Sequence, residues 1–142
     1  MLLCLGDGQN FSLADVTGFL TPSQRNHVEG AVIENSEIWT GLEMSRNILC
    51  KTGNSRPIKH CYWKRSSSVM PGVTTNSFNV SVEGIIRNGY EYSGKGLKNG
   101  YCGMSIKNVG QNDIGLWNCT LISDDLSVFV GTLKIMLWGK SL

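Results

Sequence analysis

The feature that most constrains this chain is the spacing of two cysteines and of the residues around them. Trp63 follows Cys50 by thirteen positions, and Cys119 lies much further along the chain. The positions six, four and two before Cys119 hold Asp113, Gly115 and Trp117. This spacing predicts that Cys50 and Cys119 face each other across two sheets about 10 Å apart, with Trp63 packed over their disulfide. The chain should therefore fold as a β-sandwich.

The same spacing is typical of an immunoglobulin-like domain. Apolar residues also lie ten, thirteen and fifteen positions before Cys119, at Val109, Ile106 and Met104. A variable-type domain places its inward-facing residues at these positions, and turn signals recur at the spacing of roughly 8 to 12 residues that a sandwich requires. The predicted fold class is all-β, an antiparallel immunoglobulin-like sandwich of the variable type.

Two further cysteines predict a second disulfide between the sheets. Cys61 lies two residues before Trp63 and therefore faces the same side of its strand, while Cys102 continues the inward row of a later strand. Four cysteines allow three pairings. Only the combination of Cys61–Cys102 with Cys50–Cys119 lets both partners of each bridge face the core.

The chain divides into a leader and one domain. Residues 1–28 read as a leader or a weakly specified N-terminal segment, because the apolar Met1–Leu5 fits the tail of a signal peptide. We therefore leave Cys4 out of the disulfide framework and assign residues 29–142 to the domain. The expected strands are 32–38, 42–50, 59–64, 78–86, 102–109, 114–121 and 128–137, with turns at 66–72, 94–100 and 123–125.

The hydrophobic content of 41% fits a domain that buries a core. Two observations favour an extracellular protein, either secreted or on the cell surface. An even number of cysteines in a small domain is typical of extracellular disulfide frameworks. Three glycosylation sequons begin at Asn10, Asn79 and Asn118. The chain is therefore predicted to be a disulfide-bonded glycoprotein.

The composition excludes several classes of partner and cofactor. The formal net charge is +2 and the basic residues are scattered, so no nucleic-acid partner is expected. The longest apolar stretches fall far short of the roughly 20 residues that a membrane helix needs, so we expect no membrane insertion within this chain. No CxxC pair occurs and only His27 and His60 could join the cysteines, so no metal is expected. The glycines of 94–100 follow a GxGxxxG spacing before a strand, so no nucleotide or other cofactor is expected.

The sequence also lacks a catalytic set. His60 adjoins Cys61 but alternates outward from it, which disfavours a nucleophilic pair. Asp113 is expected to be the structural partner of a basic side chain. We therefore interpret the chain as noncatalytic.

A longer motif resembles a known family. The segment Tyr92-Ser-Gly-Lys-Gly-Leu97, followed by Gly100-Tyr-Cys-Gly-Met-Ser-Ile106, is similar to the strand D to E segment of arthropod adhesion domains of the fasciclin III type. Cys61 matches their additional strand C cysteine, and the resemblance covers about residues 45–120. It implies a cell-surface or secreted recognition domain, with homophilic adhesion as the family's familiar role. Trp117 departs from the usual tyrosine and cannot supply its hydroxyl bond.

The expected partner is a protein, either another protein or a second copy of the chain in a homodimer. Outward alternation on two central strands predicts a binding face that includes Tyr62, Lys64 and Thr120, with Tyr62 as its aromatic anchor. A glycan on Asn118 would shield this face and move recognition to loops such as Ile122–Leu126. The alternative function is a soluble secreted immune-recognition or effector protein with the same fold.

Overall fold

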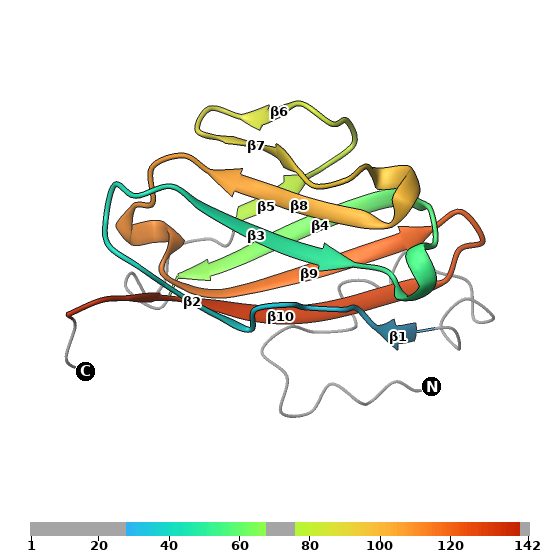
Figure 1. Cartoon of the computed structure of the whole chain (residues 1–142), viewed down its shortest axis with the longest axis horizontal. Coiled ribbons are helices and arrows are strands. Elements are labelled where there is room, and N and C mark those ends of the chain that lie inside the picture. The colour runs from blue at the N-terminus through green and yellow to red at the C-terminus, as the bar shows by residue number, and fades with distance from the viewer. Residues whose placement is uncertain (1–27, 68–75, 140–142) are drawn as a thin grey trace.

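The computed structural model describes residues 28–67 and 76–139, which form two packed β-sheets (Figure 1). Three short 3₁₀ turns join the strands: η2 (Gly53–Ser55), η3 (Leu97–Asn99) and η4 (Gln111–Asp113). The strands are β1 (Val28–Gly30), β2 (Glu37–Thr40), β3 (Arg46–Lys51), β4 (Ile58–Ser67), β5 (Asn76–Asn79), β6 (Ile85–Arg87), β7 (Tyr90–Ser93), β8 (Tyr101–Ile106), β9 (Gly115–Ser123) and β10 (Val128–Leu137).

The first sheet is centred on β9, which pairs antiparallel with β4 on one side and β10 on the other. Its strand order is β1-β10-β9-β4-β5, and β2 also pairs with β10. The pairings of β1 and β2 with β10 are both parallel. The second sheet has the order β3-β8-β7-β6 and is antiparallel throughout. The prediction of an all-β fold is therefore confirmed.

Two disulfides join the sheets. Cys50 bonds to Cys119 and Cys61 bonds to Cys102, with Cα atoms 6.6 and 6.5 Å apart. Cys50 and Cys102 are neighbours on β3 and β8, so the two bridges lie side by side in the core. These are the two pairs that the sequence predicts.

The core has the inward rows that the sequence predicts on β4 and β8. Trp63, Met104 and Ile106 are each 0% exposed, and Val109 is 1% exposed. Trp63 lies edge-on to Trp117, with ring centroids 6.3 Å apart, and both belong to one hydrophobic cluster that spans the sheets. No helix in the described part of the chain is long and apolar enough to cross a bilayer.

The predicted strand 32–38 is wrong, because this segment passes from one sheet to the other. The Ala31 amide donates to Val130 in the first sheet, Val32 then exchanges both backbone bonds with Lys51 in the second sheet, and pairing with the first sheet resumes at β2. Alternation alone predicts a continuous strand here, since it does not register a change of partner strand.

Other elements also differ from the sequence prediction. Strand β3 begins at Arg46 rather than at residue 42, because a turn precedes it, with Glu43 at φ 66°. The predicted strand 78–86 is two strands in different sheets, β5 and β6, joined where the chain crosses between the layers. The predicted turn 66–72 begins with two residues of β4 and otherwise lies outside the described residues. Strand β7, which has four residues, was not predicted from the sequence.

Candidate functional site

A buried ion pair lies beside the aromatic side chains of the core. Arg65 Nη1 donates to Asp113 Oδ1 at 2.6 Å, and the side chains are 9% and 3% exposed. The Tyr90 hydroxyl donates to the same oxygen at 2.6 Å, and the Gly110 amide donates to Asp113 Oδ2 at 2.9 Å. Asp113 is therefore the structural partner of a basic side chain, as the sequence predicts.

This network raises the pKa of Tyr90 to about 12. Burial of the phenol is the largest cause, and its hydrogen bond to Asp113 is the next, since both favour the protonated hydroxyl. Both oxygens of Asp113 already accept bonds from protein donors. The arrangement therefore ties Asp113 to three segments of the core and its flanking turn.

Trp117 makes a bond of its own to the turn before β9. Its indole N–H donates to the backbone carbonyl of Asp113 at 2.8 Å. The tyrosine hydroxyl bond is absent, as the sequence predicts, and this indole bond joins β9 to the preceding turn. The N–H group is a donor only, and a backbone carbonyl acceptor suits it.

The predicted binding face is only partly accessible. Tyr62 and Lys64 are half-buried on β4, and the Tyr62 ring lies 6.4 Å from that of exposed His60. Thr120, the third member, is 8% exposed on β9 between Tyr62 and Val130. This burial corrects the prediction that Thr120 contacts a partner, because a central strand is covered by the side chains of both neighbouring strands.

The glycosylation sequons differ in accessibility. Asn118 is 2% exposed, and its Oδ1 accepts a hydrogen bond from the Thr132 hydroxyl at 2.7 Å. This burial argues against a glycan on Asn118 in the folded domain, because a sequon alone does not report how deeply its asparagine packs. Asn79 on β5 is exposed, as a glycan site requires. Asn10 and Cys4 lie outside the described residues.

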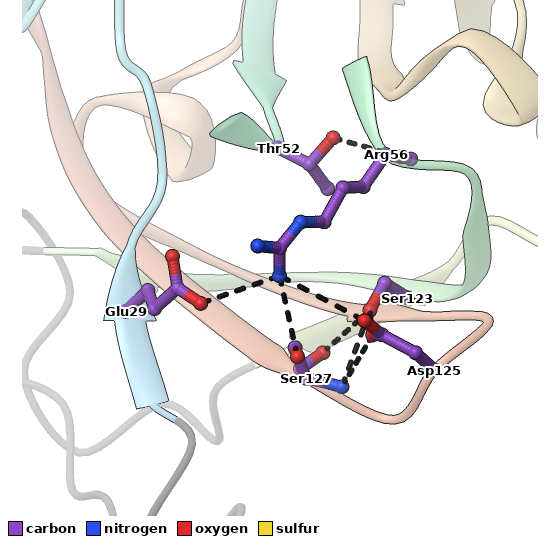
Figure 2. Close-up of polar contacts among 6 residues, drawn as sticks. All are labelled: Glu29, Thr52, Arg56, Ser123, Asp125 and Ser127. Carbon is purple, nitrogen blue, oxygen red and sulfur yellow. Dashed lines mark hydrogen bonds and ion pairs between the residues drawn. The ribbon is translucent and has the colours of Figure 1, made fainter. Parts of the chain in front are cut away.

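A polar cluster at the opposite end of β9 from Asp113 joins three separate segments (Figure 2). Arg56, in the β3–β4 connection, lies at its centre. Its Nη1 lies 3.4 Å from Glu29 Oε2 on β1, 3.3 Å from the Ser127 hydroxyl and 3.9 Å from Asp125 Oδ2. The guanidinium carbon also lies 5.6 Å from the ring centroid of Phe129. We call this region, comprising 52–57, Glu29 and 123–127, the loop end.

The β3–β4 connection is held by its own short contacts. The Thr52 hydroxyl donates to the Arg56 carbonyl at 2.7 Å, and the Thr52 amide donates to the Gly100 carbonyl at 3.0 Å. Gly100 has a φ of 86°, and a Cβ there would lie 2.4 Å from Thr52 Oγ1. Only glycine allows this close approach, so Gly100 fixes the β3–β4 connection at the loop end.

The β9–β10 turn is organised by Asp125. Its Oδ1 accepts a short hydrogen bond from the Ser123 hydroxyl and a bond from the Ser127 amide at 3.1 Å. The bond from Ser123, followed by those from Ser127, lowers the pKa of Asp125 to about 2. The carboxylate is therefore charged at all physiological pH values, and its Oδ1 joins both sides of the turn.

Leu126 occupies the tip of this turn in an unusual backbone conformation. The Ser123 amide donates to the Ser127 carbonyl and the Leu126 amide donates to the Ser123 carbonyl, both at 2.9 Å. A three-residue hairpin loop of this kind has its third residue in the left-handed region, where glycine is usual. Leu126 has a φ of 68° there, which costs about 1–2 kcal/mol for a residue with a Cβ. Its side chain is 39% exposed.

The sequence pattern indicated the loop Ile122–Leu126 but gave no sign of a role for Arg56, Arg65 or Tyr90. Arg65 could have been found, because it lies two residues after Trp63 on the same inward row. Arg56 has no comparable signal, since its partners come from β1 and from the turn after β9.

Among the described residues, no three histidine, cysteine or acidic side chains are grouped so that they could hold a metal ion. No protein-family model matches the chain, and no curated protein matches its sequence.

Proposed function

We propose that this chain is a noncatalytic extracellular recognition module, built as an immunoglobulin-like sandwich of the variable type, which binds a protein partner through its loop end. The sheet order supports this fold, because the bridge Cys50–Cys119 joins β3 in one sheet to β9 in the other, with Trp63 buried beside it. The two disulfides favour an oxidising compartment. The resemblance to fasciclin III-type domains is consistent with a role in adhesion.

The observation that carries the proposal is the loop end itself. Arg56 ties β1 and the β9–β10 turn to the β3–β4 connection, and the Asp124 amide also donates to the Pro57 carbonyl at 3.0 Å. Loops that a rigid scaffold fixes in this way are common sites of recognition, because little conformational entropy is lost on binding. The outer face around Tyr62 is the second candidate interface, since a half-buried aromatic side chain with a polar tip suits a protein contact.

The proposal is tested by presenting the oxidised protein as a multimer to an array of extracellular protein domains that includes the protein itself. Analytical ultracentrifugation of the purified protein then measures self-association. We expect binding to at least one protein domain, and Arg56→Gln should weaken it because the guanidinium no longer joins the three segments.

Arg87→Gln is the matched control. Arg87 donates to the Ser77 carbonyl at 2.7 Å and lies over Phe78, away from the loop end, so its loss should leave binding unchanged. Absence of binding to every domain and to itself would contradict the proposed function. Equal binding by the Arg56 variant and the parent would move the interface to the face around Tyr62.

A further inference from the structure

Leu126 has a left-handed backbone conformation that apolar residues rarely adopt. Four non-glycine residues in the described ranges have a positive φ, and only one of them is apolar. Asn54 is of a type that enters the left-handed region readily, and Glu43 and Ser55 are polar residues in loops. Leu126 has neither property, and a glycine at the tip would form the same turn without strain.

The core does not explain why leucine is present. Leu126 lies outside the hydrophobic cluster, and its side chain is 39% exposed. The bonds that shape the turn come from the backbone and from Ser123, Asp125 and Ser127, so none of them requires the leucine side chain. A strained and exposed apolar residue on a rigid turn is a reason to consider a binding role.

We infer that Leu126 is the anchor of the interface at the loop end, and that it inserts into an apolar pocket with a basic rim on the protein partner. This inference rests on the proposed function and adds the chemistry of the partner. A rigid turn that presents one apolar side chain suits insertion into a pocket, as hot-spot residues do.

The charges around Leu126 indicate the basic rim. Its neighbours Asp124 and Asp125 are exposed, and the Asp125 side chain retains 64% of its accessible surface. Glu29 is a third acidic group in this region. The basic groups are the guanidinium of Arg56 and the exposed ammonium of Lys59 at the start of β4. Lysine or arginine around the partner's pocket would complement the two carboxylates beside the leucine. An anionic lipid surface fits poorly, because these carboxylates would face its phosphates.

The test uses two variants that accept the backbone conformation but lack the apolar side chain, Leu126→Gly and Leu126→Asn. Both residue types enter the left-handed region readily, so the turn should persist and the melting temperature should not fall. Ile85→Asn is the matched control, because Ile85 is an apolar residue that is 74% exposed on the edge strand β6.

The probe is a phage-displayed library of disulfide-constrained random peptides, selected on the full oxidised protein. We expect the selected peptides to combine apolar residues with Lys or Arg, and to bind both Leu126 variants at least about tenfold more weakly than the parent and the Ile85 variant. Peptides that bind all four proteins equally, or that are rich in acidic residues, would overturn the inference. A parallel fall in melting temperature and binding would assign Leu126 a structural role instead.

Two further measurements separate the possible failures. Asp124→Asn should slow association and reduce its salt dependence. Asn112→Lys is the matched control, because it makes an equal change of charge on η4, beyond the other end of β9. It should not reduce the salt dependence. Binding to anionic phospholipid vesicles that is lost in Leu126→Gly would also overturn the inference. If the domain array yields a partner that Leu126→Gly still binds fully, the inference fails while the proposed function stands.

Discussion

At the scale of single residues, Asp113 links the core to the turn that precedes β9. It accepts bonds from Arg65, Tyr90 and the Gly110 amide, and its own carbonyl accepts the Trp117 indole N–H. A buried charge is tolerated only when its lone pairs are occupied, and here each oxygen has a donor. Loss of one donor therefore affects the others through the shared carboxylate.

Tyr90→Phe tests this coupling. Removal of the hydroxyl should cost about 1–3 kcal/mol at neutral pH, because Asp113 loses a hydrogen bond to a charged acceptor. The pKa of Tyr90 rises from 10.0 to about 12 in the folded protein, so its contribution to stability is complete below pH 10 and is lost as the pH rises towards 12. The variant should therefore lose less stability than the parent over this window in urea unfolding experiments.

Tyr101→Phe provides the comparison, because Tyr101 is a half-buried phenol on β8 with its ring beside Lys51 and Lys95. Its hydroxyl makes no hydrogen bond to Asp113, so this variant controls for the loss of a phenol as such. Identical curves for Tyr90→Phe and the parent would show that the phenol is not coupled to folding.

At the scale of elements, the two disulfides staple four strands in pairs. The bridge Cys61–Cys102 lies within the loop that Cys50–Cys119 closes, with sequence separations of 41 and 69 residues. Chain-entropy estimates give about 4 kcal/mol for either loop alone, and nested loops add less than their sum. All four half-cystines are 0% exposed, so an apolar residue in their place remains in the core.

Replacement of Cys61 by Val together with Cys102 by Ala should leave a folded domain with lower stability. The expected loss in urea unfolding is about 2–4 kcal/mol, since the remaining bridge still restricts the unfolded chain. Peptide mapping of the variant should show Cys50 bonded to Cys119. Free thiols at Cys61 and Cys102 in the oxidised parent protein would contradict the pairing.

At the scale of the whole molecule, the network around Asp113 and the loop end lie at opposite ends of β9, and the outer face of the sheet runs between them (Figure 1). The end with Asp113 is tied into the core by buried bonds. The other end presents the exposed apolar side chain of Leu126, which follows two exposed aspartates in the sequence. This division separates the residues that stabilise the sandwich from those that we propose recognise a partner.

Tyr62→Ala compares the two candidate interfaces directly. If the loop end carries recognition, the change should leave binding to a partner from the domain array within about twofold of the parent, and surface plasmon resonance measures it. The melting temperature should change little, because Tyr62 lies on the outer face and outside the hydrophobic cluster. A loss of at least 1 kcal/mol in binding, as for a buried aromatic anchor, would place the interface on the sheet instead.

The sequence by itself determined the all-β class, both disulfide pairs and the structural role of Asp113, because inward alternation and cysteine spacing depend only on local geometry. It missed the crossing of residues 31–37 between sheets and the division of 78–86, since alternation does not identify the partner strand. Tertiary structure alone decided that Thr120 and Asn118 are buried, because neighbouring strands and packing set that burial. It also brought together the residues of the loop end. Arg56 contacts Glu29, which is 27 residues away in the sequence, and Ser127, which is 71 residues away, and no local pattern encodes this proximity.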